Sequence, residues 1–360
     1  MLFDPPRRTS GYIGAVLFRS AADGHSATRK HDMFCGTISN QLFGSMLKKN
    51  KNLNMMRRSL FFGLIILMSF NIYGQINMND STAQVIGYWD VNEKESYIVT
   101  HEKYKIKDSD TTSREFYKYS VDITIVDSTA NSYTIDWFYR DYEIQSDNEL
   151  VNKLASITED MTIRILTDEL GAFQEVINWQ EVRDYILKAT AMLKKETADI
   201  PNMDDFIQQL EEMYSTKESI ELGTVQEMLQ FYTFHGAKYE YGEEYNVDMK
   251  VANLYGGEPF DANVTVWLDE LNPDDNNFII RMNQTVNSEQ LTEATFDYLL
   301  KMSETLNFPL PKREDIPLLT NDIWTASRIH GSGWIIYSVE TKETKAEGQT
   351  NIEERIIEIQ

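Results

Sequence analysis

A period of two runs through residues 117–125, which read YKYSVDITI. Apolar and aromatic side chains occupy the odd positions of this stretch, and polar ones occupy the even positions. Such an alternation places one set of side chains on each face of a strand, so we expect a half-buried antiparallel β-strand here. The buried face consists of Tyr117, Tyr119, Val121, Ile123 and Ile125.

The segments on either side extend this strand into a meander. Residues 127–131 are polar turn formers, after which Tyr133, Ile135, Trp137 and Tyr139 resume the alternation on a return strand. Residues 96–106 show a similar pattern, and we expect them to pair beside residues 117–125. Residues 85–144 are therefore predicted to form an antiparallel meander.

Helices follow the meander. We predict a short helix at residues 148–158, then a hairpin of residues 161–166 and 173–177, and then a helix that begins after Asn178. The Asn178 side chain is expected to accept a hydrogen bond from the first turn, with Glu181 three residues on in a capping-box arrangement. Apolar residues recur at helical spacing along this segment, at Trp179, Val182, Ile186, Ala189 and Leu193. Further helices are predicted at residues 204–214 and 225–234.

Strand patterns return after residue 237 and repeat a short motif. The residues YSVD at 119–122 recur as YNVD at 245–248. Strands are expected at residues 245–251, 264–268, 278–282, 322–328, 334–344 and 354–359, with a helix at 289–306 capped by Asn287 or Ser288. The motif predicts two related halves, although independent use of common strand residues explains it equally well.

The grouping of helices between runs of strands predicts an α+β fold of antiparallel β-meanders with helices packed on them. We expect an N-terminal half at residues 75–200, a helical connector at 201–236 and a C-terminal half at 237–360.

A secretory signal peptide is predicted at residues 55–74. Arg57 and Arg58 precede an unbroken apolar run of residues 60–70, and Ile72 and Gly74 fit the two positions that precede a cleavage site. The run is shorter than the roughly 20 residues that span a bilayer, which favours a cleaved signal over a retained anchor. Residues 1–54 show no domain-like pattern, and we interpret them as an upstream extension, with Met55 or Met56 as the true start.

Charge and cysteine content restrict the function further. Residues 1–74 hold ten basic and three acidic side chains, so residues 75–360 keep 24 basic and 54 acidic ones, a net charge of −30. This acidity argues against nucleic acid as a partner, because phosphates are bound through Lys and Arg. The one cysteine, Cys35, lies upstream of the apolar run, so no cysteine is placed for a lipid anchor. We therefore expect a periplasmic or secreted protein that is not lipid-anchored.

The signal peptide ending in Tyr73-Gly74-Gln75 and the acidic, tyrosine-rich strands resemble uncharacterised exported proteins of Gram-negative bacteria. The resemblance is one of general style over residues 55–360 and supplies no functional motif.

No catalytic motif stands out. The chain has no HExxH zinc motif, P-loop or dinucleotide fingerprint, and the segment His330–Trp334 departs from the GxSxG spacing of a nucleophile elbow. Carboxylates are so abundant that no acid/base pair can be singled out. Whether the protein is an enzyme stays open, with a non-catalytic role favoured.

Two groups of residues are candidate binding sites. An aromatic sheet face wrapped around a helix can enclose an apolar ligand, although the same residues commonly form a core. The residues of this face are Tyr117, Tyr119, Tyr133, Trp137 and Tyr139.

Oxygen-bearing side chains lie close together in one turn, as calcium ligands do, although a plain turn uses the same residue types. These are Asp269, Asn272, Asp274, Asp275 and Asn277.

Three functions are consistent with these observations. The preferred one is an exported envelope protein that binds an apolar ligand or a partner protein without catalysis; no cofactor is predicted, and calcium is the one ion with a candidate site. The second is a secreted carboxylate-dependent hydrolase assisted by calcium. The third is a structural component of an envelope assembly, which would expose a flat apolar patch.

Overall fold

The structure is a computed structural model of the 360-residue chain. It describes residues 75–146, 161–196, 214–223, 225–251, 257–306 and 312–360, with positions 204, 207, 208, 211 and 253. The expected signal peptide, the extension before it and the helix expected at residues 148–158 lie outside the described residues. No helix in the described part is long and apolar enough to cross a membrane.

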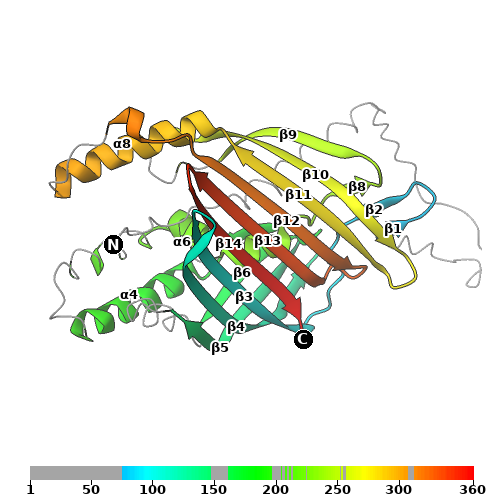
Figure 1. Cartoon of the computed structure of the whole chain (residues 1–360). Coiled ribbons are helices and arrows are strands. Elements are labelled where there is room, and N and C mark those ends of the chain that lie inside the picture. The colour runs from blue at the N-terminus through cyan, green and yellow to red at the C-terminus, as the bar shows by residue number, and fades with distance from the viewer. Residues whose placement is uncertain are drawn as a thin grey trace, which may run out of the picture.

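The described residues form mainly antiparallel sheet with a few helices (Figure 1). The large sheet has eleven strands. In spatial order they are β7 (Phe173–Val176), β6 (Thr162–Asp168), β5 (Ser132–Gln145), β4 (Asp110–Thr129), β3 (Lys94–Lys107), β14 (Gln349–Ile359), β13 (Ile335–Ala346), β12 (Thr320–His330), β11 (Asn277–Val286), β10 (Phe260–Asn272) and β9 (Glu244–Val251).

A small sheet and five helical segments complete the described fold. The small sheet contains β1 (Ile76–Asn77), β2 (Thr82–Gln84) and β8 (Lys238–Glu240). The helical segments are α4 (Trp179–Glu196), α6 (Lys217–Gly223), α7 (Gln226–Tyr232), α8 (Ser288–Leu306) and the 3-10 turn η2 (Arg313–Asp315).

The alternating segments form the strands that their period predicts. Residues 117–125 belong to β4, which pairs with β5 on one side and β3 on the other, and Val121, Ile123 and Ile125 are fully buried. The expected hairpin after residue 161 is present as β6 and β7. The antiparallel meander is thus confirmed from Lys94 onward, whereas residues 85–93 form no strand.

One pairing joins the beginning and the end of the described chain. β14 lies antiparallel to β3 over its whole length, from Gln349 opposite Lys107 to Ile359 opposite Tyr97. Strands β3–β7 and strands β9–β14 therefore form one continuous sheet and not two separate sheets. Two related halves are not evident in this arrangement.

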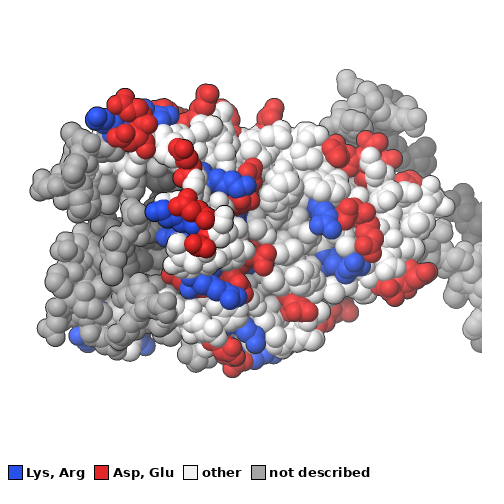
Figure 2. Space-filling model, in the orientation of Figure 1, with Lys and Arg blue, Asp and Glu red and all other residues white. Residues whose placement is uncertain are grey.

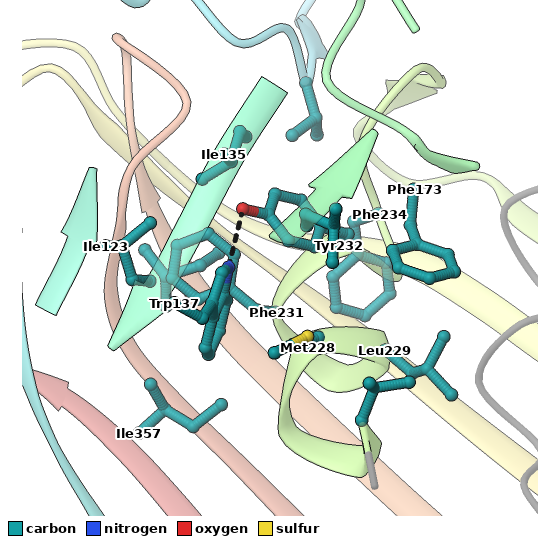
Figure 3. Packing of buried hydrophobic residues seen from close by; sticks show 14 of the residues in the cluster. Ile123, Ile135, Trp137, Phe173, Met228, Leu229, Phe231, Tyr232, Phe234 and Ile357 are labelled. Atoms are coloured by element: carbon teal, nitrogen blue, oxygen red, sulfur yellow. Dashed lines mark hydrogen bonds between the residues drawn. The ribbon is translucent and has the colours of Figure 1, made fainter. Parts of the chain in front are cut away.

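Helix α7 lies inside the curve of the large sheet (Figure 3). Six of its residues, from Glu227 to Tyr232, are buried. Phe231 packs edge-on against Tyr97 of β3 and Trp137 of β5, with ring centroids 5.3 Å away in each case. The Trp137 indole N–H donates a hydrogen bond of 3.3 Å to the Tyr232 hydroxyl. A helix this short is not stable alone, so packing against the sheet holds it.

Residues 85–93 close one end of the curved sheet. Backbone hydrogen bonds connect this segment to three others, from Val85 to Ala237, from Gly87 to Leu170 and from Tyr88 to Ser332. Gly333 has φ +87°, and a Cβ there would lie 2.3 Å from the Ile86 carbonyl oxygen, so only glycine fits under the segment. This closure packs Trp89 against Trp334, 5.2 Å apart between centroids.

The two expected helix caps differ in outcome. Asn287 caps α8 as predicted, its Oδ1 accepting the Gln290 N–H at 3.0 Å. For Asn178 the structure shows other bonds: its Oδ1 accepts the Arg164 N–H of β6 at 2.8 Å, and its Nδ2 donates to Glu181 Oε2 at 3.3 Å. Asn178 therefore ties α4 to the sheet, an interaction between distant residues that local sequence does not reveal.

Truncation of the α7 core should be costly. Phe231→Ala removes a fully buried ring between opposite arms of the sheet, and we expect the free energy of unfolding to fall by about 3–5 kcal/mol in urea titrations. Met192→Ala on α4 is the control, since this side chain is 57% exposed and its loss should change stability by less than about 0.5 kcal/mol. A Phe231→Ala cost below about 1 kcal/mol would contradict the central position of α7.

Buried His235 should make stability depend on pH. Burial lowers the pKa of His235 to about 4, while its ring nitrogen Nε2 donates a hydrogen bond to the Gly333 carbonyl. The unfolded chain binds this proton near pH 6.5, so the native state should lose about 3 kcal/mol as the pH falls from 6.5 to 4. We expect His235→Phe to have a flatter slope of stability against pH in this window, and an equal slope would refute the assignment.

Candidate functional site

The five aromatic residues expected to bind a ligand lie on the inner face of the large sheet, the face that surrounds α7. Three of them are used in packing. Trp137 and Tyr139 are at most 2% exposed, and the Tyr133 hydroxyl donates a 2.9 Å hydrogen bond to the Gly87 carbonyl of the closing segment. These three residues therefore pack as part of the hydrophobic core.

The other two, Tyr117 and Tyr119, lie further along the inner face and are only partly buried. The Tyr117 hydroxyl donates a hydrogen bond to Glu115 at 2.8 Å, and its ring lies 5.9 Å from His101. The ammonium of Lys103 is 5.7 Å from the centre of the same ring. Here the inner face changes from an apolar core to a mixed aromatic and charged surface.

A β-bulge adds an aromatic residue that the alternation assigns to the other face. Asp141 has φ +57°, and the β4–β5 register shifts between Lys118 and Ser120. The extra residue turns Tyr142 inward, where it stacks on Tyr119 with centroids 4.8 Å apart and ring planes 18° apart. Bulges commonly re-aim side chains next to functional sites.

Helix α7 supplies a buried carboxylate next to these rings. The Tyr139 hydroxyl donates a hydrogen bond to Glu227 Oε1 at 2.5 Å, and Glu227 is 7% exposed. Burial raises the pKa of the Tyr139 and Tyr119 hydroxyls well above the ordinary value, and the charge of Glu227 adds to the effect. Both tyrosines are therefore neutral hydrogen-bond donors at physiological pH.

A buried arginine lies on the same face, on β14, which is separated from β4 by β3 alone. Arg355 of β14 is 9% exposed, and its Nη1 donates to Glu340 Oε1 at 3.2 Å and to Gln230 Oε1 of α7 at 3.4 Å. Burial acts to lower the pKa of Arg355, but the carboxylates of Glu340 and Glu227 raise it, so the guanidinium stays charged.

We call this set of residues the inner-face cluster. Its members come from β4, β5, β13, β14 and α7, which only the folded sheet brings together. They are Tyr117, Tyr119, Tyr139, Tyr142, Glu227, Glu340 and Arg355.

The cluster combines aromatic rings with paired charges. Arg355 pairs with Glu340, and the hydroxyls of Tyr117 and Tyr139 donate to Glu115 and Glu227. A carboxylate catalyst needs a raised pKa in a cleft. Among the described residues, burial raises the carboxyl pKa of Glu95 and of Glu221. Neither belongs to the cluster: Glu221 accepts the Val176 N–H at a sheet edge, and Glu95 lies on β3 near Glu93.

The candidate calcium ligands occupy the turn between β10 and β11. Asn272 Nδ2 donates to Asp275 Oδ2 at 2.8 Å, and Asp269 pairs with Arg281 at 2.7 Å. Asn277 Oδ1 accepts a hydrogen bond from Arg328 at 2.6 Å, while Asp274 is exposed. In the described part of the chain, no group of three or more His, Cys, Asp or Glu side chains could hold a metal ion. These contacts are those of a plain turn.

The outer face of the sheet has a different character. Figure 2 shows acidic and basic side chains interspersed over the face of the molecule that the view presents. On β4, Asp122 accepts hydrogen bonds from Lys94 at 2.8 Å and from Arg140 at 3.0 Å. Burial acts to raise the pKa of Asp122, but these cations hold it well below the ordinary value. The aromatic and charged residues of the cluster are thus confined to the inner face.

Sequence reasoning missed Tyr142, Glu227 and Arg355. The alternation assigns Tyr142 to the outer face, and its only signal was Asp141, a residue type that tolerates positive φ. Glu227 and Arg355 look like ordinary surface charges in the sequence, and only their burial distinguishes them. No protein-family model matches the chain, and no curated protein sequence matches it.

The hydrogen bond between Tyr139 and Glu227 should contribute to stability. Tyr139→Phe leaves a buried carboxylate without its donor, and we expect a loss of about 1–3 kcal/mol in urea unfolding. Tyr337→Phe, at a 37% exposed position, is the control and should be nearly neutral. In a double-mutant cycle with Glu227→Met, the double variant should lose less than the sum of the single variants, and simple additivity would show that the two groups do not interact.

Proposed function

We propose that this protein is an exported, non-catalytic envelope protein that binds an apolar ligand at the inner-face cluster. The observation that carries the proposal is the stacked pair of Tyr119 and Tyr142, 4.8 Å apart on a partly buried part of the inner face. Aromatic rings at such a position offer large apolar area to a ligand.

The bulge supports a role for this pair beyond packing. A non-glycine residue at positive φ, as at Asp141, is less favourable than ordinary strand backbone. The same bulge brings Tyr142 next to Tyr119. The less favourable backbone at Asp141 therefore coincides with the place where the two rings stack. Tyr142 lies at the margin of the core, partly buried against it, whereas Phe231 packs against Trp137 and Tyr97 at the centre.

Charge at the cluster defines the ligand further. Arg355, Glu340 and Glu227 neutralise one another in part, and Lys103 lies over Tyr117. A strongly charged ligand would need to disrupt these pairs, which is costly for partly buried groups. A predominantly apolar molecule with a small polar group requires no such change.

Export is part of the proposal and rests on the sequence. Residues 57–74 have the basic pair, the apolar run and the small residue of a signal peptide, and the remaining chain is acidic. A protein that carries apolar ligands in the envelope would combine such a signal peptide with an aromatic surface that is partly shielded from solvent.

For the architecture we keep the proposal of two related halves, β3–β7 and β9–β14. Its support is the motif of residues 119–122 in β4 and 245–248 in β9, with Tyr119 and Tyr245 both on the inner side. Strand β4 has a neighbour on each side whereas β9 is at an edge, so the two segments do not hold equivalent places in the sheet.

Binding of N-phenyl-1-naphthylamine, a neutral probe that fluoresces in apolar surroundings, tests the proposal. We expect saturable binding to the purified protein and about tenfold weaker affinity for Tyr119→Ala and for Tyr142→Ala, because each change removes one ring of the stack. The control is Tyr104→Ala, which removes a tyrosine of β3 from the outer face. Absent binding, or equal loss with the control, would refute the proposal.

A further inference from the structure

The large sheet has two edge strands, and the structure treats them differently. Edge strand β7 has four residues, and the carboxylate of Glu221 in α6 accepts its Val176 N–H at 2.8 Å. Edge strand β9 has eight residues and pairs only with β10 among the described elements (Figure 1). Edge strand β7 is therefore short and covered by α6. Edge strand β9 is longer, and no strand of the described residues lies beside its outward backbone groups.

An open edge is a template for another strand. Every second residue of an antiparallel edge strand directs its N–H and C=O groups away from the sheet. Natural edges are protected by proline, bulges, very short length or charged side chains. Strand β9 has charges at Glu244, Asp248 and Lys250 but no proline or bulge, and keeps an unbroken register with β10 from Glu244 to Val251. Its backbone can accept a further strand without rearrangement.

The side chains of β9 are self-complementary in one antiparallel register. A two-fold axis through Val247 places Glu244 opposite Lys250 of the second copy, and Lys250 opposite its Glu244. On the inner side the same axis places Tyr245 opposite Met249 and Val247 opposite Val247. Opposite charges across a strand pair stabilise it, and aromatic or β-branched neighbours add to this.

The neighbouring registers are less favourable. An axis through Asn246 places Glu244 opposite Asp248, and an axis through Asp248 places that carboxylate opposite its own copy. Like charges directly opposite destabilise a strand pair. The pattern of charges therefore selects the axis through Val247.

The partner of Lys250 within the chain does not block this contact. Its ammonium pairs with Asp261 at 2.5 Å, but the Lys250 side chain is 62% exposed and can approach a second carboxylate. The net negative charge of the protein opposes association of two copies at a distance, and physiological salt screens that repulsion beyond roughly 8 Å. The short-range pairs at the edge are screened less.

We propose that β9 is the interaction surface for a second copy of this chain, giving a two-fold dimer in which the two large sheets are continuous through antiparallel β9 strands. The inner faces of both copies then lie on the same side of the joined sheet. This inference is independent of the ligand proposed above, because it uses other residues.

Sedimentation equilibrium of the purified protein at physiological salt, over a concentration series, tests the proposal. We expect a monomer–dimer equilibrium, and Glu244→Lys and Lys250→Glu should each weaken the dimer about tenfold. An equimolar mixture of the two variants should associate nearly as well as the unchanged protein, because each interface then regains a Lys–Glu pair. Glu347→Lys, at an exposed turn position, is the control for net charge and should not weaken association.

Hydrogen exchange locates the contact independently of these variants. Amides of residues 244–251 should become more protected as the concentration rises through the dimerisation range, while those of β7 should not. A monomer at all concentrations would overturn the proposal. A dimer that is insensitive to both charge reversals and shows no added protection in β9 would overturn it equally.

Discussion

The burial of α7 within the curve of the large sheet is the interaction on which the rest of the structure depends. Phe231 and Tyr232 pack against Trp137 of β5 (Figure 3), and Phe231 also packs against Tyr97 of β3. Gln230 donates a hydrogen bond of 2.9 Å to Ser338 of β13. Strands from both ends of the chain therefore pack on one short helix. Because the helix is too short to be stable by itself, sheet and helix must form together.

This constraint divides the inner face into two parts. Around Phe231 the face is apolar, and the closing segment of residues 85–93 covers it with Trp89 and Trp334. Toward Glu227 of α7 the same face carries the inner-face cluster, whose buried ions are stable only because each has partners of the correct sign or hydrogen-bonding type. The proposed ligand surface is thus a continuation of the core along the same strands.

Sequence reasoning identified the strands because their alternation is a local property. Residues 117–125 are an example, since their buried positions follow from period two. The pairing of β3 with β14 was not predictable, because no local pattern specifies which distant strand becomes a neighbour. The inward turn of Tyr142 was missed for a different reason, namely that one residue in the left-handed region, Asp141, reverses the alternation. Trp137 and Tyr139 lie on a sheet face that surrounds a helix, as the sequence predicts. Side chains of α7 occupy the space next to them.

Native mass spectrometry of the protein purified without detergent from an envelope fraction tests export and ligand binding in one experiment, because it reports the mature N-terminus and any retained ligand together. We expect a chain that begins near Gln75 and carries a non-covalent small-molecule adduct, which is lost when Tyr119 and Tyr142 are both replaced by alanine. A chain of the same mature mass without any adduct would contradict the claim that the inner-face cluster holds an apolar ligand, and an uncleaved chain would contradict export.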